Sequence, residues 1–236
     1  MSSKGWLSKA LTLAVVCTGV SLVFSAGVCR AKTMKKSTKV HKVHEGFTYQ
    51  KLDKDTIQRM KGKSYKKGAR ISLSQLRYLK IRYIDFEGNE QEGEMVVNKK
   101  IAKSTLKIFY ELYQIKYPIE RMCLVDEYDA DDEASMAANN TSAFNYRKIA
   151  NSNKMSKHSQ GLAIDINPQI NPYITSYGIA PKNGKVYKNR EVKSCQGKYR
   201  NYMIHHGDKV YRIFRKYGFR WGGDWKHSKD YQHFER

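Results

Sequence analysis

The sequence is poor in cysteine once its first 31 residues are set aside. Four cysteines occur in 236 residues, and two of them, Cys17 and Cys29, lie in the amino-terminal stretch. The other two, Cys123 and Cys195, belong to no Cys-x-x-Cys pair, which excludes a zinc site built on paired cysteines. Two cysteines in an exported domain can form one disulfide. Two unpaired buried thiols are the alternative, and the sequence leaves both open.

Acidic residues are also scarce. Lys and Arg number 44 against 22 Asp and Glu, which gives a formal net charge of +22. A field of this size attracts polyanions, and nucleic acid and an anionic cell envelope are both candidates. Because the chain has no nucleic-acid-binding motif, we expect no nucleic-acid partner. The anionic envelope is therefore the partner that the charge favours.

Charged residues are missing from one stretch near the amino terminus. Residues 10–28 are apolar or small, with Lys4 and Lys9 before them and Arg30 after them. This is the layout of an export signal, and the run is also long enough for an uncleaved membrane anchor. Thr, Ser and Gly within it lower its hydrophobicity and favour cleavage. We assign residues 1–31 to a signal peptide or amino-terminal membrane anchor. The chain is therefore expected to be exported, to the periplasm or to the extracellular, cell-wall face.

The remainder divides into a basic linker over residues 32–70 and a domain over residues 71–236. The linker is rich in lysine and weakly apolar, with a short helical piece near residues 55–61. His41 and His44 lie in it, and we expect both to be solvated because nothing hydrophobic surrounds them.

The domain begins with a predicted β-hairpin. Residues 76–86 and 91–97 are rich in β-branched and aromatic residues, and turn-forming residues separate them. Further along the chain we predict a helix over residues 99–117, a short strand over residues 119–125 and an acidic loop over residues 126–133 that starts a short helix. Residues 171–200 are predicted to form a surface excursion that forms one wall of a cleft, and residues 208–217 a second helix.

Two distant segments carry the residues that we interpret as a metal site. His158 and Asp165 lie seven residues apart, and His233 lies near the carboxyl terminus. Two imidazole nitrogens and one carboxylate oxygen suit a catalytic zinc, which keeps a fourth position open for water. A strand over residues 162–167 would turn its isoleucines to the core and Asp165 to the cleft, because alternate residues face opposite ways. Gly161 would allow the turn before that strand.

Two further residues are candidates for the chemistry of hydrolysis. Asp230, three residues before His233, is placed to take a proton from the attacking water. Arg147 is the candidate cation that stabilises charge developing on oxygen, or that binds a terminal carboxylate of the substrate. His205, His206 and His227 are rival ligands, but none of them lies in such a pattern.

Together, the two segments resemble the zinc D-alanyl-D-alanine carboxypeptidases of the VanY type. The resemblance rests on Ser156-x-His158-x-x-Gly161-x-Ala163-x-Asp165 and on Asp230-x-x-His233. The stretches Trp221-Gly222-Gly223-Asp224-Trp225 and His233-Phe234-Glu235 look like the closing signature of one branch. These enzymes belong to the M15 family of peptidoglycan peptidases, which also includes L-alanyl-D-glutamate endopeptidases.

The resemblance covers roughly residues 94–236 and implies roles for single residues. It implies that Zn2+ is bound by His158, Asp165 and His233, and that Asp230 is the catalytic base. Ser142-x-Phe144-x-x-Arg147 is similar to the arginine segment of the family, and Ser156 and Trp225 become candidates for substrate binding. The implied fold is α+β, of the DD-peptidase/hedgehog type, with a small antiparallel sheet that carries the zinc site and helices packed on one side.

The resemblance implies an exported, zinc-dependent peptidase that hydrolyses peptidoglycan stem peptides. Removal of the terminal D-alanine is the expected reaction. Some branches of the family have glutamate as the base, whereas this chain has Asp230, as in the endopeptidase-like branch. An L-alanyl-D-glutamate endopeptidase is therefore an alternative. A non-catalytic module that binds the cell wall is another, although the presence of all three ligands and a base argues against it. We expect the protein to be a monomer.

Overall fold

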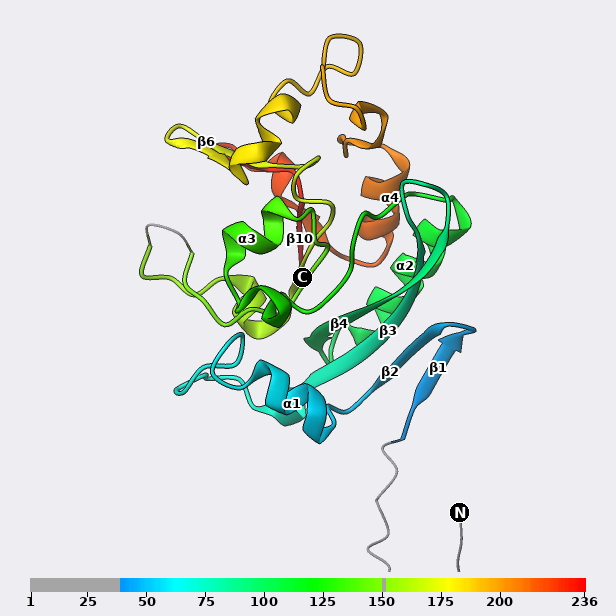
Figure 1. Cartoon of the computed structure of the whole chain (residues 1–236), viewed down its shortest axis with the longest axis vertical. Helices are drawn as coiled ribbons and strands as arrows, with labels where there is room; N and C mark the ends of the chain where they lie inside the picture. Colours follow the sequence, from blue (N-terminus) through cyan, green and yellow to red (C-terminus); the bar gives the residue numbers. More distant parts are fainter. Residues whose placement is uncertain (1–38, 150–151) are drawn as a thin grey trace, which may run out of the picture. The chain divides into compact units, whose positions relative to one another are not determined.

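The computed structural model describes residues 39–149 and 152–236, so the predicted signal or anchor segment lies outside the described residues. The fold is α+β, and its strands form three small antiparallel sheets (Figure 1). None of the described helices is long and apolar enough to cross a membrane.

The largest sheet has the order β1-β2-β3-β4 and antiparallel neighbours throughout. Its strands are β1 (His41–His44), β2 (Phe47–Gln50), β3 (Leu76–Ile84) and β4 (Glu90–Asn98). The β3–β4 pair confirms the predicted hairpin. Its turn is held by Asp85, whose carboxylate accepts the backbone N–H groups of Glu87 and Asn89.

The predicted linker over residues 32–70 is wrong for residues 41–50, which form β1 and β2 of this sheet. The ring of His44 stacks on Tyr110 with centroids 3.5 Å apart, and Phe47 is buried in the core. Helix α1 (Lys54–Met60) confirms the short helical piece, and Asp53 caps it by accepting the N–H of Thr56. These two strands were not predicted because each has only four residues, and the lysine and histidines of β1 leave it little apolar pattern.

Helices α2 (Ala102–Gln114) and α4 (Lys209–Lys216) confirm the two predicted long helices. Helix α2 packs on the β1–β4 sheet, and α4 packs against α2. The apolar spacing explains why α2 packs on the sheet, because Ile108 and Leu112 lie on one face of α2 and are fully buried. Asp208 caps α4 by accepting the N–H of Tyr211.

The short strand predicted over residues 119–125 is wrong. Its apolar residues are buried as expected, but its backbone makes isolated contacts rather than a ladder. Met122, for example, accepts the N–H of Glu94 at the side of β4. The acidic stretch after it starts helix α3 (Asp132–Ala137), as predicted, and Asp131 is the cap.

The two smaller sheets carry the strands that reach the site, which is compatible with the α+β fold and small antiparallel sheet that the resemblance implied. One has the order β5-β10-β8 and the other β7-β6-β9. Their strands are β5 (Ala163–Asp165), β6 (Tyr173–Thr175), β7 (Gly178–Ala180), β8 (Arg220–Trp221), β9 (Lys229–Asp230) and β10 (His233–Glu235).

The excursion over residues 171–200 is folded rather than irregular. It contains the β6–β7 hairpin and a small apolar cluster that includes Tyr187 and Cys195. Arg190 fixes it to the rest of the domain by donating to the carbonyls of Ile170 and Ile204, and its guanidinium lies 4.3 Å from the ring centre of Tyr231. Cys123 and Cys195 are both free thiols, but only Cys195 is buried, so the alternative of two unpaired buried thiols holds in part.

Candidate active site

His158 is positioned by a short 3-10 turn, Lys157–Gln160. Ser156 caps this turn, since its hydroxyl accepts the N–H of His158 at 3.3 Å. Gly161 follows with a positive φ of 63°, and a Cβ at this position would lie 2.7 Å from the backbone nitrogen of Asn98. Glycine is therefore required for the chain to turn from His158 into β5.

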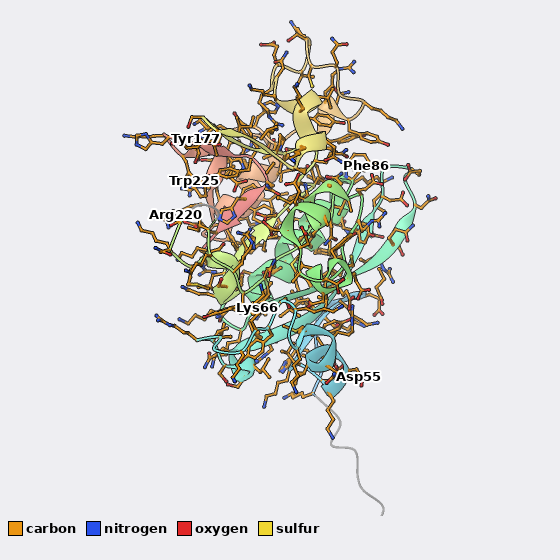
Figure 2. All side chains as sticks on the ribbon, turned by 60° about the vertical axis from the view of Figure 1, so that its left-hand side comes forward. Asp55, Lys66, Phe86, Tyr177, Arg220 and Trp225 are labelled. Carbon is orange, nitrogen blue, oxygen red and sulfur yellow. The ribbon has the colours of Figure 1, made fainter. Side chains whose placement is uncertain are left out.

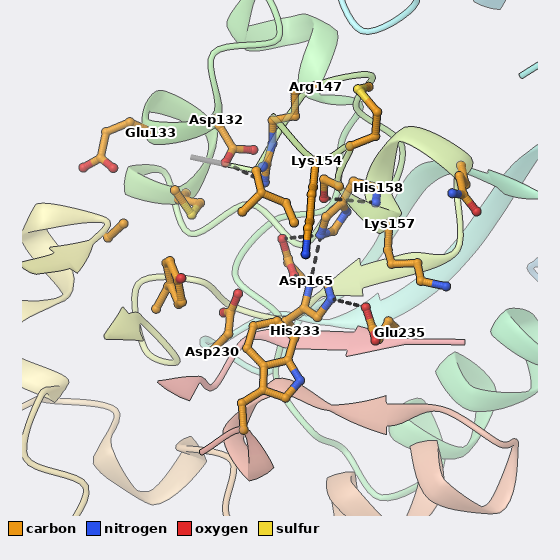
Figure 3. A pocket seen from close by; sticks show the side chains of 18 residues that line it. Asp132, Glu133, Arg147, Lys154, Lys157, His158, Asp165, Asp230, His233 and Glu235 are labelled. Atoms are coloured by element: carbon orange, nitrogen blue, oxygen red, sulfur yellow. Dashed lines mark hydrogen bonds and ion pairs between the residues drawn. The ribbon is translucent and has the colours of Figure 1, made fainter. Parts of the chain in front are cut away.

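Asp165 and His233 face each other across the β5–β10 pair, where they are register partners. Both are buried, and so is His158. His158 Nε2 lies 3.1 Å from Asp165 Oδ2, His233 Nδ1 lies 3.1 Å from Asp165 Oδ1, and the two nitrogens are 3.1 Å apart. Thus three side chains predicted from the sequence converge on one point (Figure 3).

The hydrogen bonds on the far side of each imidazole determine which nitrogens face that point. His158 Nδ1 contacts the backbone carbonyl of Ala143, which can only accept, so Nδ1 carries the hydrogen. His233 Nε2 lies 3.4 Å from Glu235 Oε2, which in the same way assigns the hydrogen of a neutral ring to Nε2. When both rings are neutral, the two remaining nitrogens are acceptors directed at a carboxylate.

Such a convergence of acceptors fits a metal ion. Acceptors repel one another unless a proton or a cation lies among them. Zinc lies about 2.0–2.1 Å from nitrogen and oxygen ligands, so the donor atoms of a tetrahedral site are about 3.4 Å apart. The two histidine nitrogens are 3.1 Å apart, close to that value, and each lies 3.1 Å from a different oxygen of Asp165. His158, Asp165 and His233 therefore fit the three protein ligands of a zinc ion.

The electrostatics of the cluster also favour positive charge at its centre. Burial acts to raise the pKa of Asp165, but the neighbouring imidazoles outweigh it and hold this pKa below its usual range. Burial acts to lower the pKa of His233, but hydrogen bonds to Asp165 and Glu235 outweigh it and raise this pKa to about 10. Without a metal ion, the cluster therefore stabilises a proton at the position that a metal cation would occupy.

Asp230 approaches the same point from a different strand. It lies in β9, and Figure 3 shows it on the opposite side of His233 from Glu235. A Cβ at Gly222 would lie 2.7 Å from the carbonyl oxygen of Asp230, so a glycine is needed where the chain passes so close. Burial raises the pKa of Asp230 to about 7, and its Oδ1 has no hydrogen-bond partner among the described residues.

Arg147 reaches the cavity from the opposite wall. Its Nη2 lies 2.7 Å from Asp132 Oδ2, at the start of α3. The cavity has a volume of about 560 Å³, within the ~300–1,000 Å³ range of ligand pockets. Ser156 and Trp225 also line it, and the ring of Trp225 lies 5.3 Å from that of His233. Every residue proposed for the site from the sequence therefore borders one cavity, and none of the rival histidines does.

Comparison with known proteins agrees with this geometry. Residues 150–236 match the family model described as D-alanyl-D-alanine carboxypeptidase, Peptidase_M15_4. Over this segment the chain is similar to peptidases of the M15 family. Searches of curated proteins and of solved structures returned no match. The matched segment contains His158, Asp165, Asp230 and His233, whereas Arg147 precedes it.

Three residues of the candidate site were not assigned a role from the sequence. Glu235 contacts His233, Asp132 contacts Arg147, and Tyr173 pairs with Asp230 in register and lines the cavity. Only Glu235 left a signal in the sequence. It lies two residues after His233, so a strand at this position places both on one face. The other two depend on how distant segments pack.

Proposed function

We propose that this chain is a zinc-dependent peptidase that hydrolyses peptidoglycan stem peptides and releases their terminal D-alanine. One observation carries the proposal. Within a segment that matches a D-alanyl-D-alanine carboxypeptidase family model, His158, Asp165 and His233 present three metal-binding atoms to a cavity that Asp230 also lines. A binding module without turnover would have no need of Asp230 beside such a cluster.

The proposed chemistry divides among the residues around the cavity. A zinc ion held by His158, Asp165 and His233 would polarise the scissile carbonyl and acidify a water molecule. Asp230 then takes the proton of the attacking water and returns it to the leaving amine. Burial acts to raise the pKa of Asp230, which suits a group that gives back a proton as well as taking one.

Arg147 supports the same reaction from the other wall of the cavity. Its guanidinium can pair with the terminal carboxylate of a stem peptide, because planar forks bind carboxylates with two parallel hydrogen bonds. Asp132 already holds one side of this guanidinium and so fixes the direction in which the other side points. A substrate with a free carboxyl terminus is what this arrangement favours.

The test is hydrolysis of a stem pentapeptide that ends in D-alanyl-D-alanine. The purified protein is incubated with the peptide before and after metal removal by a chelator, and again after zinc is restored. Products are followed by mass spectrometry. We expect loss of one D-alanine, abolished by the chelator and recovered with zinc. An amidated pentapeptide is the matched control, and it should be a poorer substrate because it lacks the carboxylate.

Other outcomes would redirect or reject the proposal. Cleavage between L-alanine and D-glutamate would identify the endopeptidase alternative, in which Asp230 keeps its role. Zinc binding without cleavage of either bond would favour the binding module. Cleavage that is indifferent to the chelator would contradict a metal-dependent reaction.

We also propose that the protein acts outside the cytoplasm, against an anionic envelope. The charge-free run over residues 10–28 supports export. Helices α2 and α4 support the proposal of an anionic partner, because their solvent-facing positions are basic. We call the exposed basic residues of these two helices the α2–α4 face: Lys103, Lys107, Lys209, Arg212, Arg215 and Lys216.

Most of the α2–α4 face is not neutralised within the protein. Of its six residues, only Lys216 has a carboxylate within 4.0 Å, that of Glu111, among the described residues. Residues 1–38 and 150–151 contain no Asp or Glu that could change this. On the β3–β4 surface, in contrast, Lys80 and Arg82 are paired with glutamates of the neighbouring strand. The α2–α4 face is therefore a place where a polymer of negative charges can be bound.

A further inference from the structure

Glu235 connects the candidate metal site to the outside of the β5-β10-β8 sheet. Its Oε2 lies 3.4 Å from His233 Nε2, and its Oε1 accepts a hydrogen bond from Arg220 Nη2 at 2.9 Å. Arg220 is its register partner on β8. The carboxylate is 14% exposed, whereas Arg220 is 68% exposed (Figure 2). A chain of contacts thus runs from solvent through Arg220 and Glu235 to His233.

The two imidazoles of the cluster are held by partners of different charge. His158 donates to the neutral carbonyl of Ala143, whereas His233 has the carboxylate of Glu235. Outer carboxylates of this kind fix the orientation and tautomer of a histidine and make its other nitrogen a better donor to metal. Glu235 is well placed for this because residues two apart on a strand share a face.

We infer that Glu235 is a positioning residue of the metal site: it holds His233 with Nδ1 directed at the metal and increases the affinity of the site for zinc. Arg220 keeps the carboxylate in place but contributes little itself, because it is largely exposed to water. This inference rests on the metal site of the proposed function, but it concerns metal affinity rather than cleavage.

The test is zinc affinity, measured by competition with a chromogenic chelator. Glu235→Ala should weaken zinc binding about 10–100-fold, the usual effect of removing an outer carboxylate. Glu235→Gln keeps an acceptor oxygen without the charge, so its loss should be smaller. Arg220→Ala should stay within about threefold of the wild type. The cobalt-loaded Glu235→Ala protein should also show a changed visible spectrum, because the geometry at His233 changes.

Glu92→Ala is the matched control, since Glu92 is a strand carboxylate paired with an exposed lysine, Lys80, away from the site. It should bind zinc like the wild type. Thermal unfolding of the zinc-free proteins separates metal affinity from general instability, and we expect similar midpoints. Zinc binding by Glu235→Ala within twofold of the wild type would refute the inference. So would an equal loss in Arg220→Ala, which would make the surface ion pair the cause.

The proposed function can fail separately. If Glu235→Ala loses zinc affinity and the wild type cleaves no stem peptide, the inference stands and the proposed reaction does not. A wild type that binds no zinc contradicts both.

Discussion

Asp230 differs from the three candidate ligands in what surrounds it. His158, Asp165 and His233 contact one another, whereas Asp230 Oδ1 is buried without a partner among the described residues. A buried carboxylate without a partner is costly, and it is retained where the group has a chemical role. Asp230→Asn has nearly the same shape and removes the base alone. We expect kcat for stem-peptide hydrolysis to fall about 10²–10⁴-fold while zinc affinity changes by less than about threefold.

His233→Ala provides the comparison for that prediction. It removes one of three ligand atoms, so zinc binding and hydrolysis should be lost together. Metal content after dialysis and the rate of D-alanine release measure both properties on the same samples. Full activity of Asp230→Asn would mean that another group takes the proton.

At the residue scale, the sequence predicted identities better than orientations. The spacing and the resemblance indicated His158, Asp165 and His233, and the structure brings them together. Which nitrogen of each histidine faces the centre could not be predicted, because it depends on the carbonyl of Ala143 from another segment and on the side-chain orientation of Glu235. The pairing of Arg147 with Asp132 was hidden for the same reason.

At the scale of elements, one ion pair joins α1 to the β1–β4 sheet. Arg59 Nη1 donates to Glu94 Oε2 at 2.9 Å, and the hydroxyl of Tyr78 donates to the same oxygen at 2.8 Å. Burial acts to raise the pKa of Glu94, but these hydrogen bonds outweigh it and hold the pKa below its usual value. The charged form of Glu94 therefore stabilises the fold.

That direction determines how stability depends on pH. A carboxyl with a lowered folded-state pKa stabilises above its unfolded value, about 4.3, and this contribution is lost as the pH falls through the folded value. Glu94→Gln should lower the free energy of unfolding by about 1 kcal/mol at pH 7, a modest figure because Arg59 is over one third exposed. Below about pH 4 the difference from the wild type should shrink.

Urea unfolding at several pH values measures this difference. Glu92→Gln is the control, because Glu92 lies on the same strand and its partner Lys80 is half exposed. It should change the unfolding free energy little at any pH. A Glu94→Gln effect that stays constant from pH 7 to pH 3 would show that packing, rather than charge, is responsible.

The elements that the sequence predicted are those with a strong local pattern. Helices α2 and α4 have apolar residues on one face and clear ends, and the β3–β4 hairpin has a well-formed turn. The β1–β2 hairpin was missed because a four-residue strand gives too little alternation to detect. The strand predicted over residues 119–125 failed because its apolar residues are buried by β4 and the site segments without a neighbouring ladder.

At the scale of the whole molecule, the net charge predicts a partner but not its place of binding. The sequence alone gives +22 and cannot say which lysines remain unpaired. The structure separates paired surfaces, such as β3–β4, from the α2–α4 face. Binding to a polyphosphate or teichoic-acid-like polymer should therefore be strong at low salt and fall steeply as salt rises, because bound counterions are released.

Substitution of four residues of the α2–α4 face tests that placement. Replacing Lys103, Lys107, Arg212 and Arg215 by alanine should weaken binding to a poly(glycerol phosphate) column and lower the salt dependence by about one unit for each lost phosphate contact. Hydrolysis of a short soluble stem peptide should not change, because none of the four lines the cavity. The matched control replaces four exposed lysines of the 171–200 excursion, namely Lys185, Lys188, Lys193 and Lys198. Equal weakening by both sets would show that only net charge matters, since the α2–α4 face would then have no advantage over other basic surfaces.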